Sequence, residues 1–243
     1  MPQVMVRWSS ISIPKDPPVR QSLMNLFQRW TAVAALNKKR TLVAVTAVTA
    51  VCGAGFLALM MLQPPELADL SEENRYQLPN LKAQWARGDL VVLVRHLERC
   101  DKEDFPCWEG SDGITSRSVG VGRELGEDFF QLGLSKSDIY NSPLSRTAQT
   151  EQIVFKDVGK DQEWLYRCRE TMLADALKSK MPGRNLVLVT HSSCIAKFEQ
   201  ALGYDSDTPD YGTSLFFSAT EAPGSLAALG FLDAEDWFIA LGF

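Results

Sequence analysis

The chain has 243 residues, a mass of 27.0 kDa, 45% hydrophobic residues and 23% charged residues, which excludes a disordered or fibrous protein and allows one substantial core. Residues 1–40 hold seven Lys and Arg against one acid, so the remaining residues carry 18 basic and 29 acidic side chains. This acidic body lacks the basic surface that nucleic-acid binding needs, and no nucleic-acid partner is predicted.

The first predicted element is an apolar helix at residues 41–62, TLVAVTAVTAVCGAGFLALMML, which contains no charged residue. At 1.5 Å per residue it would be about 33 Å long, enough to cross a membrane. The cluster NKKR directly before it predicts a cytoplasmic N-terminus. We therefore expect a basic cytoplasmic tail at 1–40, an uncleaved single-pass inner-membrane anchor at 41–62, and a periplasmic remainder. A cleaved signal peptide and a buried core helix are the alternatives.

A connector of mixed charge is expected at residues 63–88 and a single domain at 89–243. Apolar runs predict strands at LVVLV (90–94), DIYNSP (138–143) and NLVLV (185–189). Amphipathic stretches predict helices at VGVGRELGEDFFQLG (119–133), LSRTAQTEQIVF (144–155) and YRCRETMLADALKSK (166–180). This alternation favours an α/β fold with a mixed, mostly parallel sheet and helices on both faces.

The two histidines of the chain share one local context, because each stands one residue beyond an apolar strand. Ligands of such sheets bind beyond the carboxyl ends of the strands, so the polar residues there are expected to converge. They are Arg95, His96, Arg99, Arg146 and His191. Guanidinium groups bind phosphate oxygens in pairs, so this set is suited to a small dianion. A strand-end histidine or a solvated arginine taken singly is ordinary, and only the joint arrangement indicates a site.

Three motifs, LVRHLER (93–99), SPLSRTAQT (142–150) and LVTHSS (188–193), resemble the signatures of the histidine phosphatase superfamily in their expected order. Within it, the apolar anchor, the ERCD stretch and the cysteines are most similar to the lipopolysaccharide core heptose(II)-phosphate phosphatases. The resemblance implies a membrane-anchored periplasmic phosphatase that hydrolyses a phosphomonoester through a phosphohistidine. Its substrate would be a phosphorylated sugar such as lipopolysaccharide core heptose phosphate, and no cofactor or metal is predicted.

The resemblance also implies roles for single residues. His96 is the nucleophile, while Arg95, Arg99, Arg146 and His191 hold the phosphate and stabilise its charge. Glu170 is the expected proton donor, with Glu98 as the alternative and a surface ion pair as the competing role of Glu170. Two residues depart from the family pattern: glycine usually follows the first histidine, where this chain has Leu97, and glycine or an Asp-containing turn follows the second, where it has Ser192. Leu97 would either crowd the pocket or reshape its rim.

The cysteines bear on the compartment, since an oxidising one favours pairing. Cys52 lies in the apolar helix, and the four others are Cys100, Cys107, Cys168 and Cys194. We expect Cys100 to pair with Cys107 and Cys168 with Cys194. A Cys100–Cys194 pair is the rival, four free thiols remain open, and no ligand spacing supports a zinc site.

Two other functions stay open. A non-catalytic phosphoglycan-binding domain would keep the same fold. GVGRELG (120–126) is a weak match to a nucleotide-binding loop, because no strand directly precedes it. The motifs recognise only phosphate, so selectivity is assigned to two loops, residues 101–116 and 203–213. The oligomeric state is not indicated.

Overall fold

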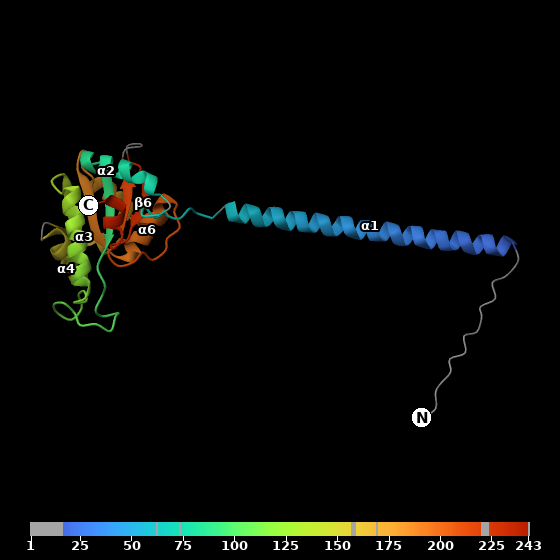
Figure 1. Cartoon of the computed structure of the whole chain (residues 1–243), viewed down its shortest axis with the longest axis horizontal. Helices are drawn as coiled ribbons and strands as arrows, with labels where there is room; N and C mark the ends of the chain where they lie inside the picture. The colour runs from blue at the N-terminus through green and yellow to red at the C-terminus, as the bar shows by residue number, and fades with distance from the viewer. Residues whose placement is uncertain are drawn as a thin grey trace, which may run out of the picture. The chain divides into compact units, whose positions relative to one another are not determined.

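The computed structural model describes residues 17–61, 63–72, 74–156, 159–168, 170–219 and 224–242. The chain divides into two compact units, Met1–Gln63 and Pro64–Phe243. In Figure 1 the first contains one long helix and the second a sheet covered by helices. Residues 1–16 of the predicted cytoplasmic tail lie outside the described residues.

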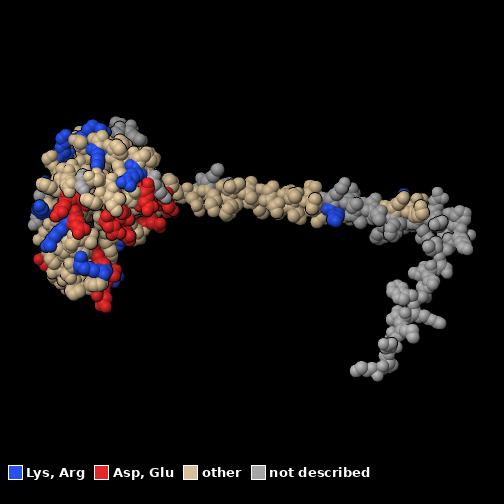
Figure 2. All heavy atoms as spheres, viewed as in Figure 1, with Lys and Arg blue, Asp and Glu red and all other residues tan. Residues whose placement is uncertain are grey.

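The first unit is built on α1, Pro17–Met61, which begins well before the predicted span and includes the NKKR cluster. It is the one helix in the described part of the chain that is long and apolar enough to cross a membrane, with mean hydropathy 1.6 over Arg40–Leu57. Thr46 and Thr49 donate their hydroxyls to carbonyls of the preceding turn, which satisfies them within the helix. After Arg40 the stretch shows no charged side chain in Figure 2, and its valines and leucines are exposed. An apolar surface of this kind is typical of a membrane span.

The second unit is built on a six-stranded sheet with the order β3-β2-β4-β1-β5-β6. The strands are β1 Leu90–Arg95, β2 Ser137–Asn141, β3 Lys160–Asp161, β4 Asn185–Thr190, β5 Ser214–Ser218 and β6 Ala227–Leu232. The first four are mutually parallel, whereas β5 runs antiparallel to both of its neighbours. The predicted mixed, mostly parallel sheet is confirmed.

Helices cover both faces of this sheet. They are α2 Leu78–Arg87, α3 Ser118–Leu132, α4 Ser145–Phe155, α5 Met172–Ser179, α6 Ser192–Leu202 and α7 Trp237–Leu241, with short 3-10 turns at Arg75–Gln77 and Glu163–Leu165. Alternate residues of β1 point to opposite faces: Val92 and Val94 pack with α2, α3, α4 and α7, and Val91 and Leu93 with α5 and α6. The period of two along each strand therefore produces two apolar layers.

The segment predicted as a connector contributes to the core. Leu78, Leu81 and Trp85 of α2 are buried, and Trp85 donates its indole N–H to the Gly133 carbonyl at 2.8 Å. Before α2, Leu70 N–H donates to the Phe231 carbonyl of β6, so this segment lies along the sheet edge. The compact unit accordingly begins at Pro64, 25 residues before the predicted domain boundary at residue 89.

One helix is shorter than predicted, and one weak motif match is not supported. The predicted helix at 166–180 begins at Met172, because a turn and a disulfide hold the residues before it on the face of β4. The GVGRELG stretch lies within α3 and does not form a strand-to-helix turn. A phosphate-binding loop of the nucleotide type is therefore not formed there.

Candidate active site

The ends of three parallel strands build the site. Central β4 pairs with β1 on one side and β2 on the other, so the residues after these strands meet at one edge. His96 N–H donates to the Thr190 carbonyl at 3.0 Å, and the rings of His96 and His191 are 5.3 Å apart. They line a cavity of about 310 Å³, the histidine cavity, together with Arg95, Arg99, Lys102, Arg146, Tyr166, Ser192, Ser193 and Tyr211. The five predicted phosphate-site residues are thus brought together.

Two hydrogen bonds hold the ring of His96, and the first determines which nitrogen carries the proton. Its Nδ1 lies 2.7 Å from the Leu97 carbonyl, which only accepts, so Nδ1 carries the proton. Nε2 is then an acceptor and takes a hydrogen bond from Arg146 Nε at 3.3 Å. Burial, followed by the nearby charges of His191, Arg146 and Arg95, lowers the pKa of His96 to about 3. At neutral pH its imidazole is neutral, with its lone pair toward the cavity.

His191 is held in a similar way. Its Nε2 lies 2.8 Å from the Ser142 hydroxyl, and the ring is buried directly before the first turn of α6. Burial, then Arg146 and Arg99, lower the pKa of His191 to about 3. A bound dianion would oppose these cations and favour protonation of the ring, so His191 is placed to stabilise negative charge.

The arginines are fixed by different neighbours. The Arg95 guanidinium stacks 3.9 Å from the centroid of the Tyr211 ring and donates to the Pro209 carbonyl. Its Nε is buried and has no hydrogen-bond partner among the described residues. Arg99 forms an ion pair with Asp101, with Nε 2.8 Å from the carboxylate. Burial lowers the pKa of Arg95, whereas the Asp101 carboxylate raises that of Arg99. These cations therefore surround the cavity in set positions.

Two helices begin at the same edge. α4 starts at Ser145, one residue before Arg146, and α6 starts at Ser192, one residue after His191. The first backbone N–H groups of a helix lack intrahelical partners and attract anions. Both helix N-termini thus add to the positive potential of the histidine cavity.

Leu97 lies outside the cavity. Its side chain is buried in a third apolar cluster with Ile114 and Val119. A Cβ on Gly122 would lie 2.5 Å from Leu97 Cδ1, so the glycine of α3 makes room for the leucine. Leu97 therefore replaces the family glycine without crowding the phosphate position.

The predicted proton donors are not brought to the cavity. Glu170 is exposed on the turn before α5, and it is absent from the cavity lining among the described residues. The carboxylate of Glu98 accepts hydrogen bonds from Arg117 and from Thr115, the latter at 2.7 Å. These partners lower the pKa of Glu98 and turn it away from the histidines. The described lining contains no carboxylate.

The lining also includes residues that were not predicted from the sequence: Lys102, Tyr166, Ser192, Ser193 and Tyr211. The Tyr166 ring stands 6.1 Å from that of His191, and the Tyr211 ring 5.7 Å from that of His96. Lys102 and Tyr211 belong to the two loops to which selectivity was assigned, so their loops, though not the residues themselves, were predicted to border the cavity. No such prediction was made for Tyr166, because it was placed in a helix.

Both expected disulfides are present in the structure, Cys100–Cys107 and Cys168–Cys194. The first closes the loop directly after Arg99. The second joins the Tyr166 segment to the first turn of α6. Thr190, at the end of β4, also holds this segment, because its hydroxyl donates to the Leu165 carbonyl at 2.9 Å. The Cys100–Cys194 rival is wrong. Cys52 of α1 is free.

Two neutral histidines facing each other among guanidinium groups, at the carboxyl ends of parallel strands, are the arrangement of a histidine phosphatase, the class that the motifs predict. Comparison with known proteins refines this class.

No family model matches the chain. The lipopolysaccharide core heptose(II)-phosphate phosphatase of Salmonella arizonae is 32% identical over 154 residues, which cover 60% of this chain and 71% of that protein. The protein of the same name from Escherichia coli K12 is 27% identical over 189 residues, 73% of this chain and 86% of that protein. The chain belongs to this family of phosphatases and is an enzyme.

Solved structures also align with the chain. A phosphoserine phosphatase from Entamoeba histolytica has 14% identity and a TM-score of 0.47, covering 60% of this chain and 98% of its own. The protein histidine phosphatase SixA complexed with tungstate has 10% identity and a TM-score of 0.46, with the same coverage.

Proposed function

We propose that the chain hydrolyses a phosphomonoester through a phosphohistidine on His96. The observation that carries this proposal is the His96 Nδ1–H bond to the Leu97 carbonyl, which leaves Nε2 unprotonated toward the cavity. A neutral imidazole with a free lone pair is a nucleophile, and a protonated one is not. In the free enzyme Arg146 donates to this lone pair, and a bound phosphate oxygen would take that donor over.

The reaction proceeds in two displacements. His96 Nε2 attacks phosphorus while the ester P–O bond breaks, and the leaving alkoxide takes up a proton. Water then attacks the phosphohistidine and gives a proton back to the group that protonated the alkoxide, the P–N bond breaks, and inorganic phosphate leaves with His96 neutral again. With no carboxylate in the described lining, we place the Tyr166 hydroxyl ahead of Glu170 as the proton source.

Arg95, Arg99, Arg146 and His191 would hold the transferred phosphoryl group. Charge on its equatorial oxygens is stabilised by donors that are already in place, which supplies much of the rate enhancement in phosphoryl transfer. The histidine cavity supports this role because cations line it and no described acid does.

For the substrate, we propose a phosphorylated sugar, specifically a heptose phosphate of the lipopolysaccharide core, as the names of the relatives state for those proteins. The loops at 101–116 and 203–213 border the cavity through Lys102 and Tyr211 and would contact the sugar. Their hydroxyl and ammonium groups suit a polyhydroxylated ligand.

For the location, we propose that residues 41–62 anchor the chain in the inner membrane, with tail 1–40 in the cytoplasm and the catalytic unit in the periplasm. Three features support this topology: the exposed apolar surface of α1 after Arg40, the NKKR cluster within α1 at residues 37–40, and two disulfides in the second unit. A reporter active only in the cytoplasm, fused after Phe243, should stay silent, and strong signal would overturn the orientation.

The activity is tested with the full-length chain in detergent. Phosphate release is measured on phosphorylated lipopolysaccharide core, simple sugar phosphates, phosphopeptides and nucleotides, with and without EDTA. We expect preference for the core substrate, no effect of EDTA, and an acid-labile phosphoprotein in rapid-quench samples. EDTA inhibition that zinc or magnesium reverses would contradict the mechanism. Phosphate binding without turnover would favour the non-catalytic alternative.

A further inference from the structure

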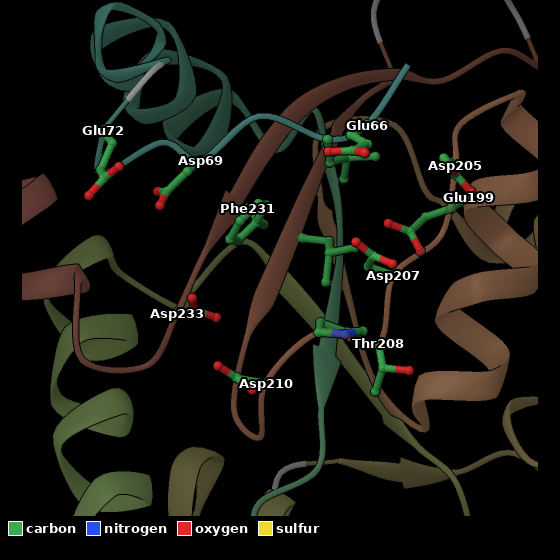
Figure 3. Close-up of a pocket in the computed structure, with 13 residues that line it drawn as sticks. Glu66, Asp69, Glu72, Glu199, Asp205, Asp207, Thr208, Asp210, Phe231 and Asp233 are labelled. Carbon is green, nitrogen blue, oxygen red and sulfur yellow. The ribbon is translucent and has the colours of Figure 1, made fainter. Parts of the chain in front are cut away.

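A second cavity of the catalytic unit has the opposite charge. This acidic pocket has a volume of about 420 Å³, and eight of its 13 lining residues are Asp or Glu. They come from three segments far apart in the sequence: residues 66–72 before α2, residues 199–210 from α6 into the following loop, and Asp233 after β6. Figure 2 shows acidic side chains gathered on one face of the catalytic unit, and Figure 3 shows those that line the pocket.

Glu199 is the buried member of this set. Its side chain extends from α6, and only 5% of the residue is exposed. In Figure 3 the carboxylates of Glu199 and Asp207 point toward the same space. Glu199 Oε2 is buried and has no hydrogen-bond partner among the described residues. A buried acceptor without a partner is costly, so the fold keeps an unsatisfied oxygen at this position.

Among the described residues, the one cation that acts on a pocket acid is Arg95 of the histidine cavity, whose pKa is lowered by burial but raised by the charge of Asp210. The lining contains no Lys or Arg, and no ion pair in the described part of the chain involves any of the eight acids. Burial, then the charges of Asp207 and Asp205, raise the pKa of Glu199 to about 7. Repulsion among neighbouring carboxylates is relieved only by protons or by a cationic ligand.

The composition of the pocket favours an organic amine over a single metal ion. A single metal ion needs several oxygens converging at about 2.0–2.6 Å. Among the described residues, no group of three acidic, histidine or cysteine side chains is placed to hold one. The carboxylates are instead spread around a wall that includes Leu67, Leu215 and Phe231. Such a lining matches ammonium groups separated by methylene chains.

We propose that the acidic pocket binds a linear aliphatic oligoamine, with one ammonium group on Glu199 and Asp207, further ammonium groups on the remaining carboxylates, and the methylenes against Leu215 and Phe231. The site is separate from the proposed phosphatase chemistry, since its lining shares no residue with the histidine cavity.

The test is isothermal calorimetry of the full-length chain in detergent, with spermine as the probe and calcium chloride as the comparison at equal ionic strength. We expect one saturable spermine site. Glu199→Gln should weaken binding at least tenfold, and Asp207→Asn about fivefold. A matched control, Glu124→Gln with Glu127→Gln on the exposed face of α3, removes two acids elsewhere and should change the affinity by less than twofold.

Glutamine has the size of glutamate and Asp207 is exposed, so neither variant depends on refolding of the core. Three results would overturn the proposal: no saturable spermine binding, equal affinity in the wild type and both pocket variants, or a saturable calcium site that Glu199→Gln abolishes while spermine does not bind. Because the calorimeter reads binding directly, loss of phosphatase activity alone would contradict the proposed function and leave this site intact.

Discussion

The histidine cavity and the acidic pocket shift the pKa of their buried groups in opposite directions, and in both cases the shift favours the neutral form. In the first, burial among cations lowers the pKa of His96 and His191 to about 3, and in the second, burial among acids raises the pKa of Glu199 to about 7. One loop serves both, because Pro209 lines the acidic pocket and accepts a hydrogen bond from Arg95. Each cavity is therefore a site for the charge it lacks, an anion in one and a cation in the other.

The largest effect is expected from His96→Asn, which keeps the size and a polar group but removes the nucleophile. Loss of a group that forms the covalent intermediate should lower kcat by on the order of 10⁴-fold or more. Steady-state phosphate release and rapid-quench labelling measure this. Residual turnover above about a tenth of the wild type would show that the histidine cavity does not work through His96.

Arg146→Lys tests whether the geometry of the cationic site matters as well as its charge. A lysine keeps the charge but loses the planar donor that contacts His96 Nε2 at 3.3 Å. By analogy with the loss of one charge-stabilising donor, we expect a 10²- to 10³-fold decrease in kcat/KM. Arg123→Lys, exposed on α3, is the matched control and should stay within twofold.

Replacing Cys168 and Cys194 by Ser tests whether their disulfide holds the Tyr166 segment in place beside the histidine cavity without affecting the acidic pocket. The lost link spans 26 residues, and such links are typically worth about 2–4 kcal/mol. Denaturant unfolding should show a decrease of this order, with a larger loss of phosphatase activity than of spermine binding. Equal losses at both sites would show that the link supports the whole unit.

Glu199→Gln should stabilise the fold at alkaline pH. Glu199 has a raised pKa when folded, so the native state binds more protons than the unfolded state between about pH 4.5 and 7, and stability is lost as pH rises through this window. The variant should gain about 1–3 kcal/mol relative to the wild type at pH 8 and little at pH 5. Urea unfolding at both pH values measures the difference. An equal gain in stability at both pH values would show that altered packing, and not loss of the carboxylate charge, causes the effect.

The smallest effect is expected from Glu170→Gln. Its exposed side chain lies outside the histidine cavity, so kcat should change by less than twofold at any pH. A tenfold loss confined to substrates with poor leaving groups would instead restore Glu170 as the proton donor and place a carboxylate in the cationic site.

The parts of the fold that depend on local pattern were predictable. The apolar runs of β1 and β4 determine the central strands, and once these are parallel, His96 and His191 must meet at one edge. Glu170 was assigned from the resemblance, and the disulfide beside it places Tyr166 over His191 instead.

Features made by distant segments could not be predicted from the local sequence pattern alone. α2 has an apolar stripe of Leu78, Leu81 and Trp85, but the mixed charge of residues 63–88 as a whole led to their interpretation as a connector. The acidic pocket needs residues 66, 199 and 233 side by side, and only the tertiary structure brings them together.

The contact of Leu70 with β6 protects one edge of the sheet from pairing with other molecules. The bridge from Asp69 to Phe231 covers part of an outer strand whose free N–H and C=O groups would otherwise be a template for another chain. The opposite outer strand, β3, is only two residues long and carries Lys160 and Asp161. Neither margin of the sheet offers a long, flat apolar strand, so strand-to-strand aggregation is disfavoured even at high local concentration.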